Sequence, residues 1–486
     1  MTDPLSAEPH AEPALQSSSG SGRPSILTLW DPRVVWVTLG AVSLIFLAAL
    51  TAMALTTVMP FVAEDLDGEA LFAIAFSGTL ATGVIGMVAS GAWSDRAGPA
   101  APLSTAVILF VLGQAMAATA PTMELLVLGR LVTGLGAGGQ TVALYVVVAR
   151  VYPPALHGRV MALFSAAWVV PSLIGPFLAG AVTEQLHWRW IFAALAVLAL
   201  AAFAMVAPRL RHLAQAPSAE RPAGVGRRLL FAVVVAVAAL ALGMTSELSS
   251  SLSPALGWAV AVGAVIVIAI AILPLLPQGM VSMRRGLPSV ILMRSLIAGS
   301  LFGAEVYVPY LLIERFGFSA MWAGLGLTAA AIAWAISAQV SGTHGDRIGN
   351  TRIAVIGVSL LAIATLACAL TPLLALPVWV PIALWSCAGF GMGLMYPRQT
   401  VLMLAYSSRA EEGFNSSALQ ISDSVGASAS IAVMGLVFTS LAGTDAQFTA
   451  VFLLALGLAL LALVPGMRLG TDMRRIPHRG KPVLTS

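Results

Sequence analysis

Long, nearly uninterrupted apolar segments dominate the pattern of hydrophobic and polar positions along this chain. Each has about 20 residues or more, which is the length that a helix needs to cross a hydrocarbon layer about 30 Å thick. Only a helix satisfies all the backbone N–H and C=O groups of such a segment inside lipid. The pattern therefore predicts fourteen spanning helices, near residues 35–62, 71–93, 101–120, 122–149, 158–183, 190–208, 228–247, 254–275, 287–313, 318–341, 352–372, 378–404, 414–440 and 446–467.

Composition agrees with an all-α polytopic membrane protein. Hydrophobic residues make up 59% of the chain and charged residues only 9%, a balance that a soluble domain of this size could not carry without aggregating. The first 33 residues differ, because they are rich in Ser, Pro, Ala and Glu and lack an apolar core. We expect residues 1–33 to form a disordered cytoplasmic tail.

The positions of the arginines predict the orientation, because loops that remain in the cytoplasm are richer in Lys and Arg. With the N-terminus inside, the outer loops hold only Arg189 and Arg315, whereas the inner loops and the basic tail 468–486 collect the others that lie outside the spans. We expect both termini to be cytoplasmic and the protein to lie in the inner or plasma membrane of a cell. This bias explains the net charge of +4, and nothing indicates a nucleic-acid partner.

Two nonapeptides, GAWSDRAGP (91–99) and GTHGDRIGN (342–350), share the frame G-x-x-x-D-R-x-G. The first copy supplies Gly91, Asp95, Arg96 and Gly98, and the second supplies Gly342, Asp346, Arg347 and Gly349. One follows the second predicted helix and the other follows the tenth, both on the cytoplasmic side.

A nearly equal separation relates GLGAGG (134–139) to GFGMG (389–393), and Gly158 to Gly413. The chain is therefore predicted to contain two copies of a six-helix unit, residues 34–208 and 287–467. A cytoplasmic linker and two inserted helices, 209–286, separate them. Parallel repeats of this kind meet at mid-membrane, where rocking of the halves exposes a site to each side in turn.

With these motifs the chain resembles the major facilitator superfamily, and specifically its fourteen-helix drug:proton antiporter branch, over residues 35–467. In that family the first nonapeptide is a signature loop, whose carboxylate and arginine latch the two halves together on the cytoplasmic side. A carboxylate near a facing helix N-terminus meets a partly positive dipole. The sequence departs from the family where Pro99, Ala100 and Ala101 replace the usual basic residues, so we expect a weaker latch.

Two further segments carry the resemblance. GRLVTGLGAGG (129–139) places Arg130 in the fourth helix, where the resemblance implies a role in proton coupling; snorkelling to the outer boundary is the alternative. PSLIGPFLAG (171–180) resembles the Gly-Pro signature of antiporters at Gly175 and Pro176, which implies export. An ordinary proline kink is the alternative here.

The first helix departs from the resemblance, because Thr51 occupies the position of the expected carboxylate, nine residues before Pro60. A proton carrier then needs another acid within the spans, and Glu305 and Asp423 are the candidates. A carboxylate in apolar surroundings holds a proton more readily than one in water, so we expect Glu305 to carry the exchanged proton. Asp423 and Arg398 lie at matching depths and are expected to form a buried pair, with direct proton coupling by Asp423 as the alternative.

Spacing also relates Glu305 to Arg294, which precedes it by eleven residues, about three helical turns. Both side chains are therefore expected to face the central cavity. Aromatic side chains on the cavity helices favour amphiphilic or aromatic cargo; the candidates are Tyr145, Trp168, Tyr307, Tyr310, Trp385 and Tyr396.

Other classes of function fit poorly. The chain lacks the GxxxxGK[ST] loop of an ATP-driven pump, and its six histidines and two cysteines form no catalytic or metal-binding pattern. We expect no enzymatic activity, metal or cofactor. The predicted function is a monomeric secondary transporter that exports amphiphilic small molecules in exchange for protons by alternating access. The alternatives are an exporter or importer of one endogenous metabolite or lipid.

Overall fold

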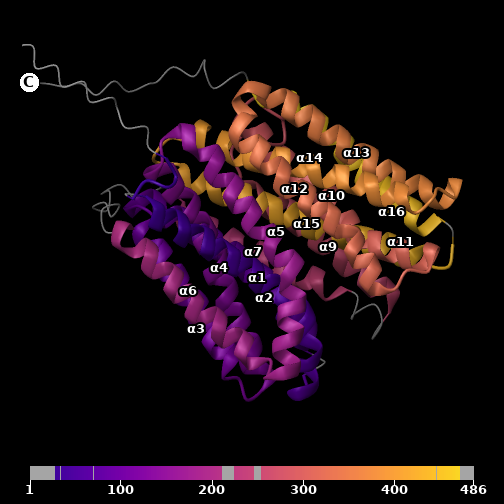
Figure 1. The fold of residues 1–486 in the computed structure, drawn as a ribbon, viewed down its shortest axis with the longest axis horizontal. Helices are drawn as coiled ribbons and strands as arrows, with labels where there is room; N and C mark the ends of the chain where they lie inside the picture. The colour runs from indigo at the N-terminus through magenta and orange to yellow at the C-terminus, as the bar shows by residue number, and fades with distance from the viewer. Residues whose placement is uncertain are drawn as a thin grey trace, which may run out of the picture.

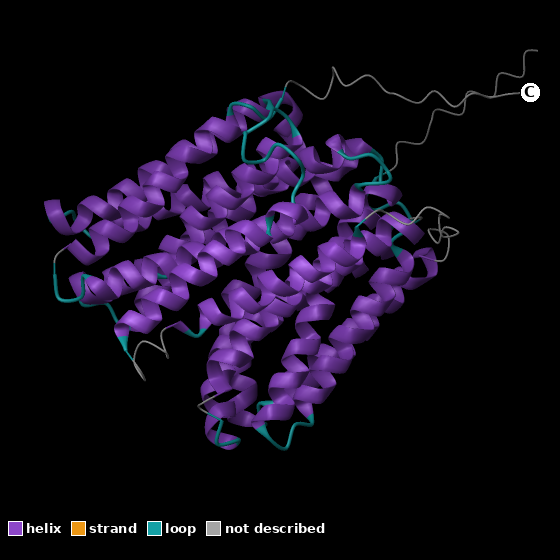
Figure 2. Cartoon of the chain, turned by 180° about the vertical axis from the view of Figure 1, so that it is seen from behind, coloured by secondary structure: helices purple, strands orange, loops and turns teal. Residues whose placement is uncertain are grey.

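The structure is a computed structural model that describes residues 28–32, 34–68, 71–210, 224–245, 253–444 and 446–470. Most of the expected N-terminal tail and of the basic C-terminal tail lies outside these residues. The described chain is helical and contains no strand (Figure 2). The helices are α1 (Val35–Asp65), α2 (Phe72–Ala97), α3 (Ala100–Ala118), α4 (Met123–Val151), α5 (Pro154–Gln185), α6 (Arg189–Leu210), α7 (Val225–Gly243), α9 (Pro254–Ala271), the short η3 (Leu273–Leu275), α10 (Leu287–Glu305), α11 (Tyr307–Phe316), α12 (Ala320–Ile348), α13 (Asn350–Leu374), α14 (Trp379–Tyr406), α15 (Glu412–Ser440) and α16 (Ala446–Gly466).

These helices confirm the all-α membrane class. Among the described residues, thirteen spans are long and apolar enough to cross a membrane. They correspond to all the predicted spans except α2, which has 26 residues and packs against α4 and α7. The exact number of fourteen spans therefore stays a prediction.

One predicted helix, 287–313, is divided in two at Val306. Proline lacks an N–H, so Pro309 leaves the carbonyl of Glu305 without its usual helical donor, and its ring crowds the preceding turn. Accordingly α10 ends at Glu305 and α11 begins at Tyr307. Glu305, which the sequence predicts to lie inside a continuous helix, therefore lies at the break between α10 and α11.

The same five helix pairings occur at the two ends of the chain. Helices α1–α6 pack as α1·α5, α1·α6, α2·α4, α3·α4 and α3·α6, and helices α10–α16 repeat this as α10·α15, α10·α16, α12·α14, α13·α14 and α13·α16. Figure 1 shows the two bundles side by side, the first in indigo to magenta and the second in orange to yellow. These pairings are consistent with two copies of one unit, although the predicted domain limits stay a prediction.

Four helix pairs join the bundles, namely α2·α15, α4·α15, α5·α12 and α5·α14. The intervening α7 packs mainly on α2, and α9 contacts α7 and α15. The cavity that both bundles line lies where α1, α4 and α5 face α10, α12, α14 and α15.

Candidate functional site

The first nonapeptide joins the two bundles at the ends that the arginine pattern predicts to be cytoplasmic. Asp95, near the end of α2, accepts hydrogen bonds from the backbone N–H groups of Gly413 (2.6 Å) and Phe414 (2.8 Å) at the start of α15. Those N–H groups have no partner within their own helix, and the helix dipole favours a negative charge there. Gly91 lies one turn earlier, where a side chain would collide with the backbone of Gly413. The carboxylate of the nonapeptide thus meets a facing helix N-terminus, which is the contact that the resemblance implies; its role as a latch stays a prediction.

The arginine that contacts the other bundle is Arg150 rather than Arg96. Arg96 is exposed and has no hydrogen bond or ion pair to any residue in the described ranges. Arg150, at the end of α4, donates from Nε to Glu412 Oε2 at 3.0 Å and from Nη2 to the carbonyl of Ser94 at 3.4 Å. From the sequence, Arg150 is one of the arginines outside the outer loops that indicate the orientation, and nothing in its neighbourhood along the chain marks Glu412 as its partner.

The second nonapeptide has a different partner for its carboxylate. Asp346 Oδ1 accepts a hydrogen bond from Arg398 Nη1 at 2.6 Å, and Arg398 Nε donates to Asn350 Oδ1, also at 2.6 Å. All three residues belong to the second bundle, whereas Asp95 binds across the bundles. Arg347 is exposed.

The glycines of the two copies behave alike. Gly342 packs against the backbone of Gly158 in α5, as Gly91 packs against Gly413. The closing glycines Gly98 and Gly349 have φ angles of 81° and 93° and end α2 and α12, a conformation that favours glycine over other residues. In each copy of the nonapeptide, one glycine therefore packs closely against a helix of the other bundle and a second glycine ends the helix.

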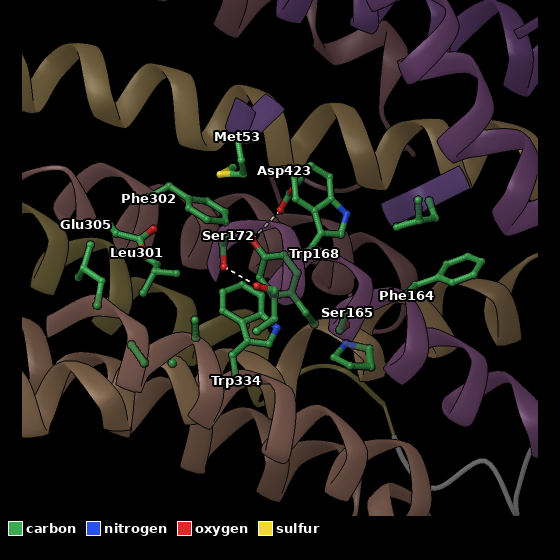
Figure 3. Close-up of a pocket in the computed structure, with 18 of the residues that line it drawn as sticks. Met53, Phe164, Ser165, Trp168, Ser172, Leu301, Phe302, Glu305, Trp334 and Asp423 are labelled. Carbon is green, nitrogen blue, oxygen red and sulfur yellow. Dashed lines mark hydrogen bonds between the residues drawn. The ribbon is translucent and has the colours of Figure 1, made fainter. Parts of the chain in front are cut away.

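A cavity of about 460 Å³ lies between the bundles (Figure 3). This volume is within the range typical of small-molecule sites. Helices α1, α4 and α5 line it from one bundle and α10, α12, α14 and α15 from the other. Its aromatic residues are Tyr145, Phe164, Trp168, Phe302, Trp334, Trp385 and Tyr396, and its charged residues are Arg294, Glu305 and Asp423.

Four of the six predicted cavity aromatics line this cavity, but Tyr307 and Tyr310 do not. Their rings pack against Phe438, with centroid distances of 4.8 and 6.2 Å. Both tyrosines follow the break at Val306, so helical spacing counted from Glu305 no longer sets the face on which they lie. The assignment of these two tyrosines to the cavity was wrong for that reason.

Arg294, Tyr396 and Asp423 form one network in the cavity wall. Arg294 Nε and the Tyr396 hydroxyl both donate to Asp423 Oδ1 at 2.8 Å, and the guanidinium carbon lies 3.4 Å from the Tyr396 ring centroid. The predicted pair of Arg398 and Asp423 is therefore wrong. Their depths match, but Arg398 follows Tyr396 by two positions and so faces away from Asp423, towards Asp346.

Glu305 faces the same cavity and has no hydrogen bond or ion pair to any described residue. In Figure 3 it lies at one end of the cavity, beside Leu301 and Phe302. Arg294 also lines the cavity, as their spacing predicts. A charge without a partner in low-dielectric surroundings is costly, so this partly buried carboxylate can be paired by a cation that enters the cavity.

Arg130 lies inside the first bundle and does not line the cavity. Its side chain is only 2% exposed, and Nε and Nη1 have no partner among the described residues. This burial argues against snorkelling. Thr51, at the position of the expected acid, donates to the carbonyl of Leu47 and accepts from Gln114 Nε2 at 3.0 Å. A neutral hydroxyl–amide pair thus occupies that position.

The Gly-Pro signature lies in α5, which continues through Gly175 and Pro176 without a break. A side chain at Gly175 would crowd Leu50 and Met53 of α1, and Met53 lines the cavity. Gly175 therefore lets α5 approach α1 closely beside the cavity.

Comparisons with known proteins agree with this architecture. The model of the Major Facilitator Superfamily matches residues 41–431 and 291–483. An uncharacterized MFS-type transporter of Mycobacterium tuberculosis is 28% identical over 82% of the chain, and the match spans 58% of that protein's length. The multidrug transporter protein MdtP of Bacillus subtilis is 24% identical over 83% of the chain and 75% of its own length.

Two solved structures have a similar fold. The human organic anion transporter MFSD10 (TETRAN) aligns with a TM-score of 0.65 and 16% identity, over 89% of this chain and 99% of that one. The proton:xylose symporter XylE aligns with a TM-score of 0.63 and 15% identity, over 88% and 94%. At these identities the likeness concerns the fold alone.

Proposed function

Because the chain belongs to the major facilitator superfamily, whose members are transporters rather than enzymes, we propose that it exports amphiphilic small molecules in exchange for protons. The export proceeds by alternating access of the cavity between the two bundles. The protein acts as a monomer in the cell membrane, with both termini in the cytoplasm.

The observation that carries this proposal is the unpaired carboxylate of Glu305 in an aromatic cavity. Arg294 and Asp423 neutralise each other at 2.8 Å, so Glu305 is the charged side chain of the cavity wall without a partner among the described residues. A proton or a cationic group of the cargo can neutralise it, but not both together. This competition couples proton entry to cargo release, and it favours cargo that joins a cation to an apolar or aromatic body.

Two observations support export as the direction. Gly175 and Pro176 fit the antiporter signature and lie where α5 packs on α1 beside the cavity. Two Bacillus subtilis relatives are named as multidrug resistance or multidrug transport proteins. An exporter or importer of one endogenous metabolite or lipid remains the second candidate, since other relatives are uncharacterized.

Efflux of a lipophilic cationic dye tests the proposal. Cells that express the protein should accumulate less dye than cells that carry an empty vector, and an uncoupler should abolish the difference. Efflux that survives the uncoupler but requires ATP would contradict proton exchange. Faster dye uptake under an imposed proton gradient would instead indicate import.

A further inference from the structure

The inserted helices α7 and α9 lie across the seam between the bundles. α7 packs along α2 of the first bundle, and α9 contacts α15 of the second. A small apolar cluster from α7 and α9, namely Ala238, Leu242, Ala261, Ala264 and Ile268, packs against Val425, Ala432 and Leu436 of α15. The insertion therefore touches both α2 and α15. These are the two helices that Asp95 joins at the predicted cytoplasmic end, a junction that we call the cytoplasmic gate.

At its cytoplasmic end, α7 contacts the cytoplasmic gate through Arg228. The guanidinium carbon of Arg228 lies 4.2 Å from the ring centroid of Phe414. The backbone N–H of the same Phe414 donates to Asp95 Oδ2 at 2.8 Å. Arg228 also borders a small gap together with Ala92 of α2 and Leu275 of η3. One residue of α15 thus contacts both α2 and the inserted helix.

We propose that Arg228 is a positioning residue of the cytoplasmic gate. Its cation–π contact holds Phe414 in place, so that the first N–H groups of α15 remain directed at Asp95. Opening of the cytoplasmic side requires α15 to leave Asp95, and Phe414 then also leaves Arg228. The inserted pair of helices therefore stabilises the cytoplasm-closed state, a role that does not depend on the identity of the cargo.

The chain offers a matched control in Arg227. Arg227 carries the same charge one position earlier, but it is exposed, whereas Arg228 is partly buried. Arg227→Gln and Arg228→Gln remove equal charge from the same helix end. Only Arg228→Gln removes the contact with Phe414.

Distances between spin labels measure the gate directly. Labels are attached to Ala101→Cys in α3 and Thr351→Cys in α13, both exposed near the cytoplasmic end, in a background where Cys368 and Cys387 are replaced by Ala. The two label sites move apart when the cytoplasmic side opens. Loss of one cation–π contact changes an equilibrium by a factor of roughly five, so Arg228→Gln should lower the ratio of closed to open populations about fivefold. Arg227→Gln should leave the ratio unchanged.

A double-mutant cycle with Phe414→Leu separates this contact from a general effect on the fold. Phe414→Leu keeps the N–H that Asp95 accepts but removes the ring. We expect Phe414→Leu to shift the populations as Arg228→Gln does, and the double variant to shift them no further. Equal effects of Arg227→Gln and Arg228→Gln, or additive effects of Arg228→Gln and Phe414→Leu, would overturn the proposal. A melting temperature within the range of the parent protein confirms that each variant is folded.

Discussion

At the scale of single residues, Glu305 differs from the other charged residues of the cavity in having no ion-pair partner among the described residues. It lines the cavity without a partner among the described residues, whereas Asp423 is held by Arg294 and Tyr396. The charge of Asp423 is therefore already balanced by a cation of the protein itself, whereas that of Glu305 is not balanced by any described residue. On this ground we propose Glu305, rather than Asp423, as the proton carrier.

Glu305→Gln should consequently abolish proton release on cargo binding while retaining cargo binding at reduced affinity. The amide keeps the shape of the side chain but does not titrate. Proton release is measured with a pH indicator on addition of a cationic dye to detergent-solubilised protein. Glu314→Gln serves as control, because Glu314 is exposed and bonds only to Gln447 in the described residues. Unchanged proton release in Glu305→Gln would pass the role of carrier to Asp423.

Sequence alone identifies these residues better than it identifies their partners. The apolar pattern sets the depth of each charge in the membrane, which is how Arg398 was matched to Asp423. It does not set the direction in which a side chain points around the helix. That direction decides the pairing, because Arg294 faces Asp423 whereas Arg398 does not. The same limit explains Tyr307 and Tyr310, which lie at the right depth but on another face.

At the scale of helices, the two nonapeptides have one geometry and two roles. Each ends a helix at a glycine and packs a second glycine against a helix of the other bundle. These features could be predicted from the repeat, since they follow from the shared frame. The carboxylates differ, because Asp95 meets the start of α15, whereas Asp346 meets Arg398 of its own bundle.

Asp95→Asn should therefore reduce turnover more than Asp346→Asn does. The substitution at Asp95 removes a charge that accepts two hydrogen bonds across the bundles, and hydrogen bonds to charged groups contribute about 1.5–3 kcal/mol each. We expect turnover to fall about tenfold or more, since about 1.4 kcal/mol corresponds to a factor of ten. Initial rates in proteoliposomes, normalised to inserted protein, measure the effect. Equal losses for both variants would show that the second copy also serves the gate.

At the scale of the whole molecule, the cavity between the two bundles is lined by one ion pair and by the carboxylate of Glu305, which has no partner among the described residues. The repeated helix pairings place the cavity between bundles that can rock against each other. The ion pair of Arg294 and Asp423 adds no net charge to the cavity wall. Among the charged residues that line the cavity in the described chain, Glu305 is then the one left to be paired; under the proposed function its partner is a proton in one direction and the cargo in the other.

Exchange of one proton for one monovalent cation moves no net charge across the membrane. A membrane potential contributes about 2.3 kcal/mol per net charge per 100 mV, but this contribution cancels when the two charges move in opposite directions. A pH gradient does not cancel, because each pH unit contributes about 1.4 kcal/mol per proton. Transport of a monovalent cationic dye by proteoliposomes should therefore follow an imposed pH gradient and ignore a potassium diffusion potential. An uncharged analogue cannot replace the proton on Glu305, so neither gradient should drive its transport. If an inside-negative potential alone drives the cationic dye outward, more than one proton is exchanged for each dye molecule, and a second carboxylate, with Asp423 as the candidate, must take part in the cycle.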